Sequence, residues 1–151
     1  MKAIVQIGNP VLKRRAHKVK RIDDQAKRLI ADLKSTLLGT SGARGLAAPQ
    51  LGLPLRVIAL KSGCAAKVIV NPEIVSVSTK SLTVREGCLS IPGVNIGITR
   101  PISCEWIGQD EHGHKIKGKA SGMDARALQH EVDHLDGILI TDRAAQEQLA
   151  A

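Results

Sequence analysis

The hydrophobic pattern near the N-terminus predicts an amphipathic α-helix. From Asp23 to Leu38, apolar residues recur at the spacing of one helix face. Asp23 can cap the first turn by accepting a hydrogen bond from a backbone N–H group. Gly39 and Gly42 follow directly and favour the end of the helix.

A second helical pattern lies late in the chain. Ser121 followed by Asp124 is similar to a capping box, which marks a helix start. Apolar residues continue at helical spacing as far as Leu135. Gly137 then favours the end of this helix, because glycine readily adopts the left-handed conformation that closes helices.

The middle of the chain contains short apolar runs typical of β-strands. We expect an α+β fold in which mixed or antiparallel short-stranded sheets surround the late, central helix, with the first helix near the N-terminus. No repeat or long linker divides the chain, so residues 1–151 are expected to form a single domain. The expected strands are Leu55 to Leu60, Lys67 to Val70, Ile74 to Thr79, Ser81 to Arg85 and Ile102 to Ile107, and the turn signals are Gly63, Asn71-Pro72, Pro92-Gly93 and His112-Gly113.

Composition restricts the pocket and the location that we expect. Hydrophobic residues make up 43% of the chain, with one tryptophan and neither tyrosine nor phenylalanine, so any substrate pocket must be aliphatic. No stretch reaches the roughly 20 apolar residues of a membrane span, and the N-terminus has no apolar signal segment. We therefore expect no membrane partner and a cytoplasmic location, with an organelle or an infected bacterial cell as alternatives.

The chain is basic, with a formal net charge of +8 and a pI near 9.8. Such a field attracts anionic surroundings, so transient contact with the ribosome through the basic surface is expected. The densest run of cations, Lys13 to Arg21, has no interleaved aromatic residues that could stack on bases. We interpret this run as a solvated face and expect no sequence-specific nucleic acid partner.

His130 and His134 frame an HExxH sequence inside the late helix. Residues four apart lie on one face of a helix, so both imidazoles can bind a single metal ion. Glu131 follows the first of them, and its carboxylate can exchange a proton with a water molecule. These residues are candidate metal ligands and a candidate general base, although an isolated HExxH match is often accidental.

A catalytic metal site usually has three protein ligands and one open position. No histidine or cysteine follows His134, so the third ligand should lie upstream. Cys88 is the best candidate, because a thiolate is a strong ligand and the preceding glycine lets the backbone approach a metal closely. Cys64 and Cys104 are interpreted as reduced cysteines that behave as small apolar residues.

Gly45 to Gln50 is a segment of mostly small residues whose main chain can pass close to a ligand. It can thereby place the Gln50 amide in a site. Hydrolysis of an amide builds negative charge on the carbonyl oxygen, and a fixed amide donor stabilises that charge. Without a metal site nearby, Gln50 would be an ordinary loop residue.

Together these three segments resemble the peptide deformylase family, whose pattern is a GxGxAAxQ loop, an EGCxS segment and a QHExDH helix. The likeness extends from Gly8–Leu12 to Gly137–Leu139. It implies a hydrolase that removes the formyl group from N-terminal formyl-methionine of new polypeptides and releases formate. It also implies one divalent metal ion held by Cys88, His130 and His134. The family resemblance implies Fe²⁺ in the cell, whereas the general affinity order favours Zn²⁺ or Ni²⁺ in purified protein.

The resemblance assigns further roles in substrate binding. The Gln50 side chain and the Leu89 backbone N–H would bind the formyl oxygen, and Gly45 would pair with the substrate backbone. Met123 and Ala127 precede the metal histidines by about two turns and one turn of helix. They are therefore candidates to line an aliphatic pocket for the substrate methionine.

The sequence departs from the family pattern near the expected peptide site. Ala43 replaces a glycine, and Arg44 replaces an aliphatic residue beside the substrate, so we expect a cationic rim with an altered peptide preference. Asn95 stands where relatives carry a longer side chain near the peptide. Glu86 and Arg100 match a structural ion pair of relatives, which could brace the cysteine segment.

Two alternatives remain open at this point. A zinc endopeptidase is favoured by HExxH alone, and the lack of a downstream ligand argues against it. A basic, ribosome-associated domain with a vestigial metal site would follow if the changes at Ala43 and Arg44 abolish turnover. The chain ends soon after Ile140–Arg143, so we expect it to lack the longer C-terminal helix with which many bacterial relatives contact the ribosome. Asp133 and Asp136 are interpreted as helix-surface carboxylates.

Overall fold

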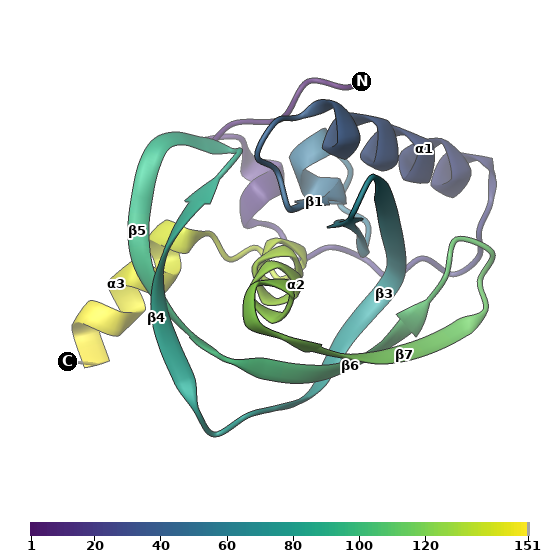
Figure 1. Ribbon diagram of the computed structural model, residues 1–151. Helices are drawn as coiled ribbons and strands as arrows, with labels where there is room; N and C mark the ends of the chain where they lie inside the picture. Colours follow the sequence, from purple (N-terminus) through teal and green to yellow (C-terminus); the bar gives the residue numbers. More distant parts are fainter. Residues whose placement is uncertain (151) are drawn as a thin grey trace.

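The computed structural model describes residues 1–150, which form two antiparallel sheets, three α-helices and two short 3-10 helices (Figure 1). The larger sheet has five strands in the order β1-β2-β3-β6-β7, and the smaller one is the hairpin β4-β5. The α+β class, with antiparallel sheets in a single domain, is confirmed. The elements are η1 (Pro10–Lys13), α1 (Asp24–Gly39), β1 (Gly45–Ala47), η2 (Ala48–Leu51), β2 (Val57–Ser62), β3 (Ala65–Val77), β4 (Ser81–Cys88), β5 (Ile91–Pro101), β6 (Ser103–Gln109), β7 (Lys115–Ser121), α2 (Gly122–Leu135) and α3 (Ile140–Ala150).

Helix α1 covers one face of the larger sheet. The Asp23 side chain caps it by accepting a hydrogen bond of 2.9 Å from the Ala26 N–H group. Its apolar face is fully buried at Leu33 and Leu37, in a cluster that includes Val57 of β2. This packing fixes β1 and β2, and β1 leads directly into η2.

Helix α2 lies in the middle of the molecule, with β3, β6 and β7 curving around one side of it and β4 and β5 around the other (Figure 1). Its buried residues Leu128 and Leu135 belong to the same core cluster as Ile69 of β3 and Trp106 of β6. Burial between the sheets makes α2 a rigid support for the side chains that it carries.

Asn71 bends a strand that the sequence predicted to be broken there. Lys67–Val70 and Ile74–Val77 both lie in β3, and the pairing of β3 with β6 shifts register around Asn71 and Pro72. Asn71 has a φ of 52°, which asparagine tolerates better than most residues. Its side chain accepts a hydrogen bond of 2.8 Å from the Val19 N–H group, so the bend is held from outside the sheet.

Three further elements were not expected from the sequence. Pro92-Gly93 lies inside β5 and does not end a strand. Strand β7 pairs with β6 along its whole length, and α3 packs against β5. Within residues 1–150, no helix has both the length and the apolar character needed to cross a membrane.

Candidate metal centre

Three candidate metal ligands from two elements meet inside the molecule. Cys88 ends β4, and His130 and His134 lie one turn apart on α2. One ligand atom from each residue lies within 4.8 Å of the others, and Cys88 Sγ is 3.4 Å from His134 Nε2. The register of β4 against β5 shifts between Gly87 and Cys88, which re-aims Cys88 as β-bulges do. The structure thus brings the predicted cysteine to the paired imidazoles.

A buried carboxylate orients the first histidine. Glu86 Oε1 lies 2.9 Å from His130 Nδ1, and Glu86 also accepts hydrogen bonds from Arg100 Nε at 2.7 Å and Arg126 Nη1 at 2.6 Å. Burial by itself raises the pKa of Glu86, but the hydrogen bonds from His130, Arg100 and Arg126 lower that pKa to about 2. Glu86 therefore stays ionised and fixes the ring so that His130 Nε2 is left for a metal ion.

The interpretation of Asp133 as a surface carboxylate was wrong. Its side chain is only 9% exposed, and it accepts hydrogen bonds from Arg100 Nη1 at 2.8 Å and from two Arg143 nitrogens at 2.5 and 2.9 Å. Since Arg100 also binds Glu86, a continuous buried network joins α3 to the metal centre. Asp136 is partly exposed and pairs with Arg56 at 3.0 Å.

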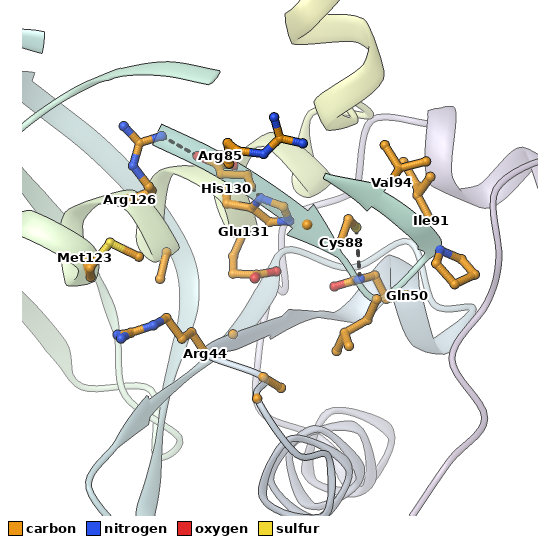
Figure 2. Close-up of a pocket in the computed structure, with 18 of the residues that line it drawn as sticks. Arg44, Gln50, Arg85, Cys88, Ile91, Val94, Met123, Arg126, His130 and Glu131 are labelled. Carbon is orange, nitrogen blue, oxygen red and sulfur yellow. Dashed lines mark hydrogen bonds and ion pairs between the residues drawn. The ribbon is translucent and has the colours of Figure 1, made fainter. Parts of the chain in front are cut away.

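Glu131 lines the same cavity as two of the candidate ligands, Cys88 and His130 (Figure 2). Burial raises the pKa of Glu131 to about 7, although the charges of His130 and Arg100 act in the opposite direction. Its Oε2 atom is buried and has no hydrogen-bond partner among the described residues. A carboxyl group with such a pKa can both accept and return a proton near neutral pH.

Gly45 has no room for a side chain because Glu131 packs against it. A Cβ atom built on Gly45 would lie 2.6 Å from Glu131 Oε1 and 2.7 Å from Glu131 Cγ. The close approach of Glu131, and not the backbone conformation, therefore favours glycine here, because the φ of Gly45 is not positive. The backbone of β1 thereby forms one wall around the carboxylate.

Gln50 is fully buried and is held at both ends of its amide. Its Oε1 atom accepts a hydrogen bond of 3.0 Å from the Ala47 N–H group, and its Nε2 atom donates to Ser90 Oγ at 3.1 Å. Nε2 also lies 3.8 Å from Cys88 Sγ. The turn of Leu89 and Ser90 after Cys88 thus places a second polar segment beside this amide.

Gln50, Cys88, His130 and Glu131 line one cavity of about 420 Å³ (Figure 2). The candidate substrate residues Arg44, Gly45, Met123 and Ala127 all contribute to its walls, and so does Ala43; Asn95 does not. Large apolar side chains are few, as the composition implies. Other lining residues include Gly42, Gln50, Glu86, Gly87, Cys88, Leu89, Ile91, Val94, Arg126, His130 and Glu131.

Sequence reasoning missed Arg126 and Ser90. Arg126 binds Glu86 and also donates to the carbonyl oxygens of Ile98 and Leu82, so it attaches α2 to the hairpin β4-β5. Its position one helical turn before His130 was the available signal, because residues four apart share a helix face. Ser90 carried no such signal, since its contact with Gln50 joins segments 40 residues apart.

The donor set fits a catalytic metal ion. One thiolate and two imidazoles are three protein ligands, which leave an open position for substrate or water. Burial lowers the pKa of His134 well below its ordinary value, and the nearby charges of His130 and Arg100 act in the same direction, which favours the neutral imidazole that metals bind. The unpartnered Glu131 Oε2 adds a hydrogen-bond acceptor in the cavity that Cys88 and His130 line.

This arrangement is of the kind that metal-dependent hydrolases use, and comparison with known proteins identifies the family. The sequence model of the family described as Polypeptide deformylase matches residues 1–150. The peptide deformylase of Dictyoglomus thermophilum is 44% identical over 149 residues, covering 99% of this chain and 96% of that relative. The solved peptide deformylase of Thermotoga maritima is 35% identical with a TM-score of 0.89, covering 95% of this chain and 97% of that one.

A second solved structure, the Synechococcus elongatus peptide deformylase in complex with actinonin, is 36% identical with a TM-score of 0.86 and covers 93% of this chain and 76% of that one. This chain belongs to the polypeptide deformylase family. Members of this metal-dependent family remove N-formyl groups from nascent peptides during protein maturation. Family membership favours this activity over the endopeptidase alternative.

Proposed function

We propose that this cavity hydrolyses the formamide bond of N-terminal formyl-methionine, with Cys88, His130 and His134 as the metal ligands. A divalent ion held there would act as a Lewis acid and would lower the pKa of a water molecule. Glu131 takes the proton from the attacking water and returns it to the departing amine. The observation that carries this proposal is the buried, unpartnered Glu131 Oε2 atom, in a cavity that Cys88 and His130 also line, beside a cluster of three ligand atoms within 4.8 Å of one another.

Gln50 and Leu89 are proposed to stabilise the oxyanion that forms as water attacks. The Gln50 Nε2 donor is preorganised by its bonds to Ala47 and Ser90, so it need not reorient during the reaction. The backbone N–H of Leu89 would supply the second donor. Formate then leaves, and the free amine of methionine remains on the peptide.

The substrate is proposed to bind along β1. Gly45 would pair with the peptide backbone, and Met123 and Ala127 would contact the methionine side chain. Arg44 would place a cation beside the second and third residues of the peptide. Comparing acidic and neutral residues there, in the wild type and in Arg44→Val, tests this preference, and equal selectivity of both proteins would reject it.

Metal identity, location and ribosome contact are also proposals. We propose Fe²⁺ in the cell and replacement by Zn²⁺ or Ni²⁺ during purification, because the general affinity order places both above iron. Activity that is lost in air together with oxidation of Cys88 would support iron, and indifference to air would support zinc or nickel. A cytoplasmic location is proposed as well. Transient contact between the basic surface and the ribosome agrees with the charge of +8.

The experiment that tests the activity is an anaerobic assay of formate release from formyl-Met-Ala-Ser, with metal content measured on the same samples. Glu131→Ala should retain the metal, because Glu131 is not a proposed ligand. It should lose activity by about a hundredfold or more, which is the usual contribution of a positioned acid–base group. Comparable rates in the two proteins would reject the role of Glu131, and no release by either would reject the function.

A further inference from the structure

A second cavity adjoins the cavity of the metal centre. It has a volume of about 640 Å³, and Gly42, Ala43, Arg44 and Ala127 line both spaces. The two cavities therefore meet where the chain enters β1. Arg44 lies at this boundary, and Figure 2 shows its side chain running on the side of Met123, away from Gln50 and Cys88.

The second cavity has an apolar floor. Leu60 of β2, Ile69 of β3, Trp106 of β6 and Leu128 of α2 all line it. Trp106 is the only aromatic residue of the chain, apart from histidines, and is 6% exposed. The ammonium group of Lys67 lies over this floor, 4.8 Å from the centroid of the Trp106 ring.

Three cations without ion-pair partners among the described residues border this floor, and one carboxylate, that of Asp124, also lines the cavity. Arg44, Lys61 and Lys67 line the cavity, and within residues 1–150 none of the three forms an ion pair, whereas Lys119 is already paired with Glu105 at 3.1 Å. The Lys61 N–H group donates to the Arg44 carbonyl oxygen at 2.8 Å, so two cationic residues stand opposite each other on neighbouring segments. Like charges in such positions repel, and an anionic ligand would relieve the repulsion.

The geometry of β1 gives a peptide one direction in which to leave the metal centre. Gln50 follows β1 in the chain and lies 3.8 Å from Cys88 Sγ, Gly45 at the start of β1 packs against Glu131, and Arg44 and Gly42 precede the strand. A peptide that follows Gly45 therefore passes Arg44 and reaches the second cavity. Since Arg44 is proposed to lie beside the second and third residues of the peptide, residues from about the fourth onward would arrive there.

We propose that the second cavity binds the downstream part of the substrate, from about the fourth residue, and favours acidic side chains there. This inference rests on the proposed function. An extended peptide suits the site better than nucleic acid, because the only ring available for stacking is buried beneath Lys67. The cations would pair with aspartate or glutamate while the apolar floor holds the intervening side chains.

Selectivity between two longer substrates tests the proposal. Formyl-Met-Ala-Ser extended by Asp-Glu-Asp is compared with the same peptide extended by three lysines, and each kcat/KM is divided by that of formyl-Met-Ala-Ser. The double variant Lys61→Gln/Lys67→Gln should lower the acidic-to-basic ratio about fivefold, the size expected for two exposed ion pairs. The effect should shrink as salt is added.

A double variant elsewhere controls for net charge. Lys20→Gln/Lys27→Gln removes the same charge from exposed positions that line neither cavity, so its ratio should equal that of the wild type. The proposal is overturned if the wild type shows no preference for the acidic extension. It is also overturned if both double variants lower the ratio equally, because long-range attraction would then explain the effect.

Binding without turnover separates failure of this inference from failure of the proposed function. The unformylated peptide Met-Ala-Ser-Asp-Glu-Asp should alter the fluorescence of Trp106 saturably, and it should bind Lys61→Gln/Lys67→Gln more weakly. This result would stand even if no formate were released from any peptide. Equal binding of acidic and basic peptides, or stronger competition by a single-stranded RNA oligonucleotide than by the acidic peptide, would overturn the inference.

Discussion

Replacing Gly45 by alanine tests the proposed catalytic geometry while every proposed catalytic side chain keeps its identity. The added methyl group would lie 2.6 to 2.9 Å from three atoms of Glu131. Ordinary contacts begin at 3.4 Å, so the carboxylate must retreat by about 0.8 Å. Glu131 is 4% exposed and lies within α2, so it cannot swing into solvent to make room.

The expected loss of activity follows from that displacement. A misplacement of about 1 Å in a catalytic group can cost about a hundredfold in rate. Overpacking of a buried site costs about 1–3 kcal/mol of unfolding free energy, so the variant should still fold. We therefore expect kcat to fall about a hundredfold with little change in metal content, because the three atoms nearest the new methyl group all belong to Glu131, which is not a proposed ligand.

The assay measures kcat for formate release, metal stoichiometry and the urea midpoint of each protein. Gly97→Ala is the matched control, because Gly97 lies in β5 outside the cavity and its nearest neighbour is a methyl group of Thr83 at 3.3 Å. That control should keep nearly full activity. A metal-loaded, folded Gly45→Ala enzyme with wild-type kcat would refute the argument that the position of Glu131 limits the reaction.

Three further outcomes are expected. Glu86→Gln should weaken metal binding about tenfold to a hundredfold and cost about 3–5 kcal/mol in urea unfolding, because it leaves buried Arg126 without a charged partner and Arg100 with Asp133 alone. The same change at half-exposed Glu105 should have little effect on either. The second outcome concerns Asp142. Partial burial raises the pKa of Asp142, but hydrogen bonds from Lys13 and the Leu139 N–H group lower it, and the net pKa is lowered. The stability that Asp142 adds should therefore be present above its ordinary pKa of 3.8 and be lost as the pH falls through its lower folded-state value. The difference in unfolding free energy between wild type and Asp142→Asn should narrow over that range, and a constant difference would contradict this assignment. Removing the metal with a chelator should lower Tm, and restoring one equivalent should recover it, since a ligand that binds only the folded state stabilises it.

Local spacing explains why much of the centre could be predicted from the sequence. The pairing of His130 with His134 follows from helical periodicity, which acts over one turn. Cys88 was chosen because no other ligand follows His134, and the structure brings its sulfur to 3.4 Å from that histidine. The helix start was also readable, because Asp23 caps the first turn of α1.

Contacts between distant segments explain what the sequence did not reveal. Asp133 is charged, and a periodicity argument assigns charged residues to the surface. Its burial depends on Arg100 from β5 and Arg143 from α3, which are distant in the chain from one another. Strand β5 was missed because the dipeptide Pro92-Gly93 is typical of a turn. Gly93 does have a positive φ, 79°, but the strand continues past it. In α3 only Ile140 is buried, so its apolar pattern was weak.

Helix α3 is connected to the candidate metal centre by a network of hydrogen bonds. The network runs from Arg143 through Asp133, Arg100 and Glu86 to His130. An engineered form that is trimmed before Arg143 would free Asp133, the carboxylate that holds Arg100 beside Glu86. Glu86 in turn contacts the proposed metal ligand His130. Leu149, by contrast, is 88% exposed. A purification tag or a linker to a solid support can therefore be attached beyond α3, while the helix itself has to be kept.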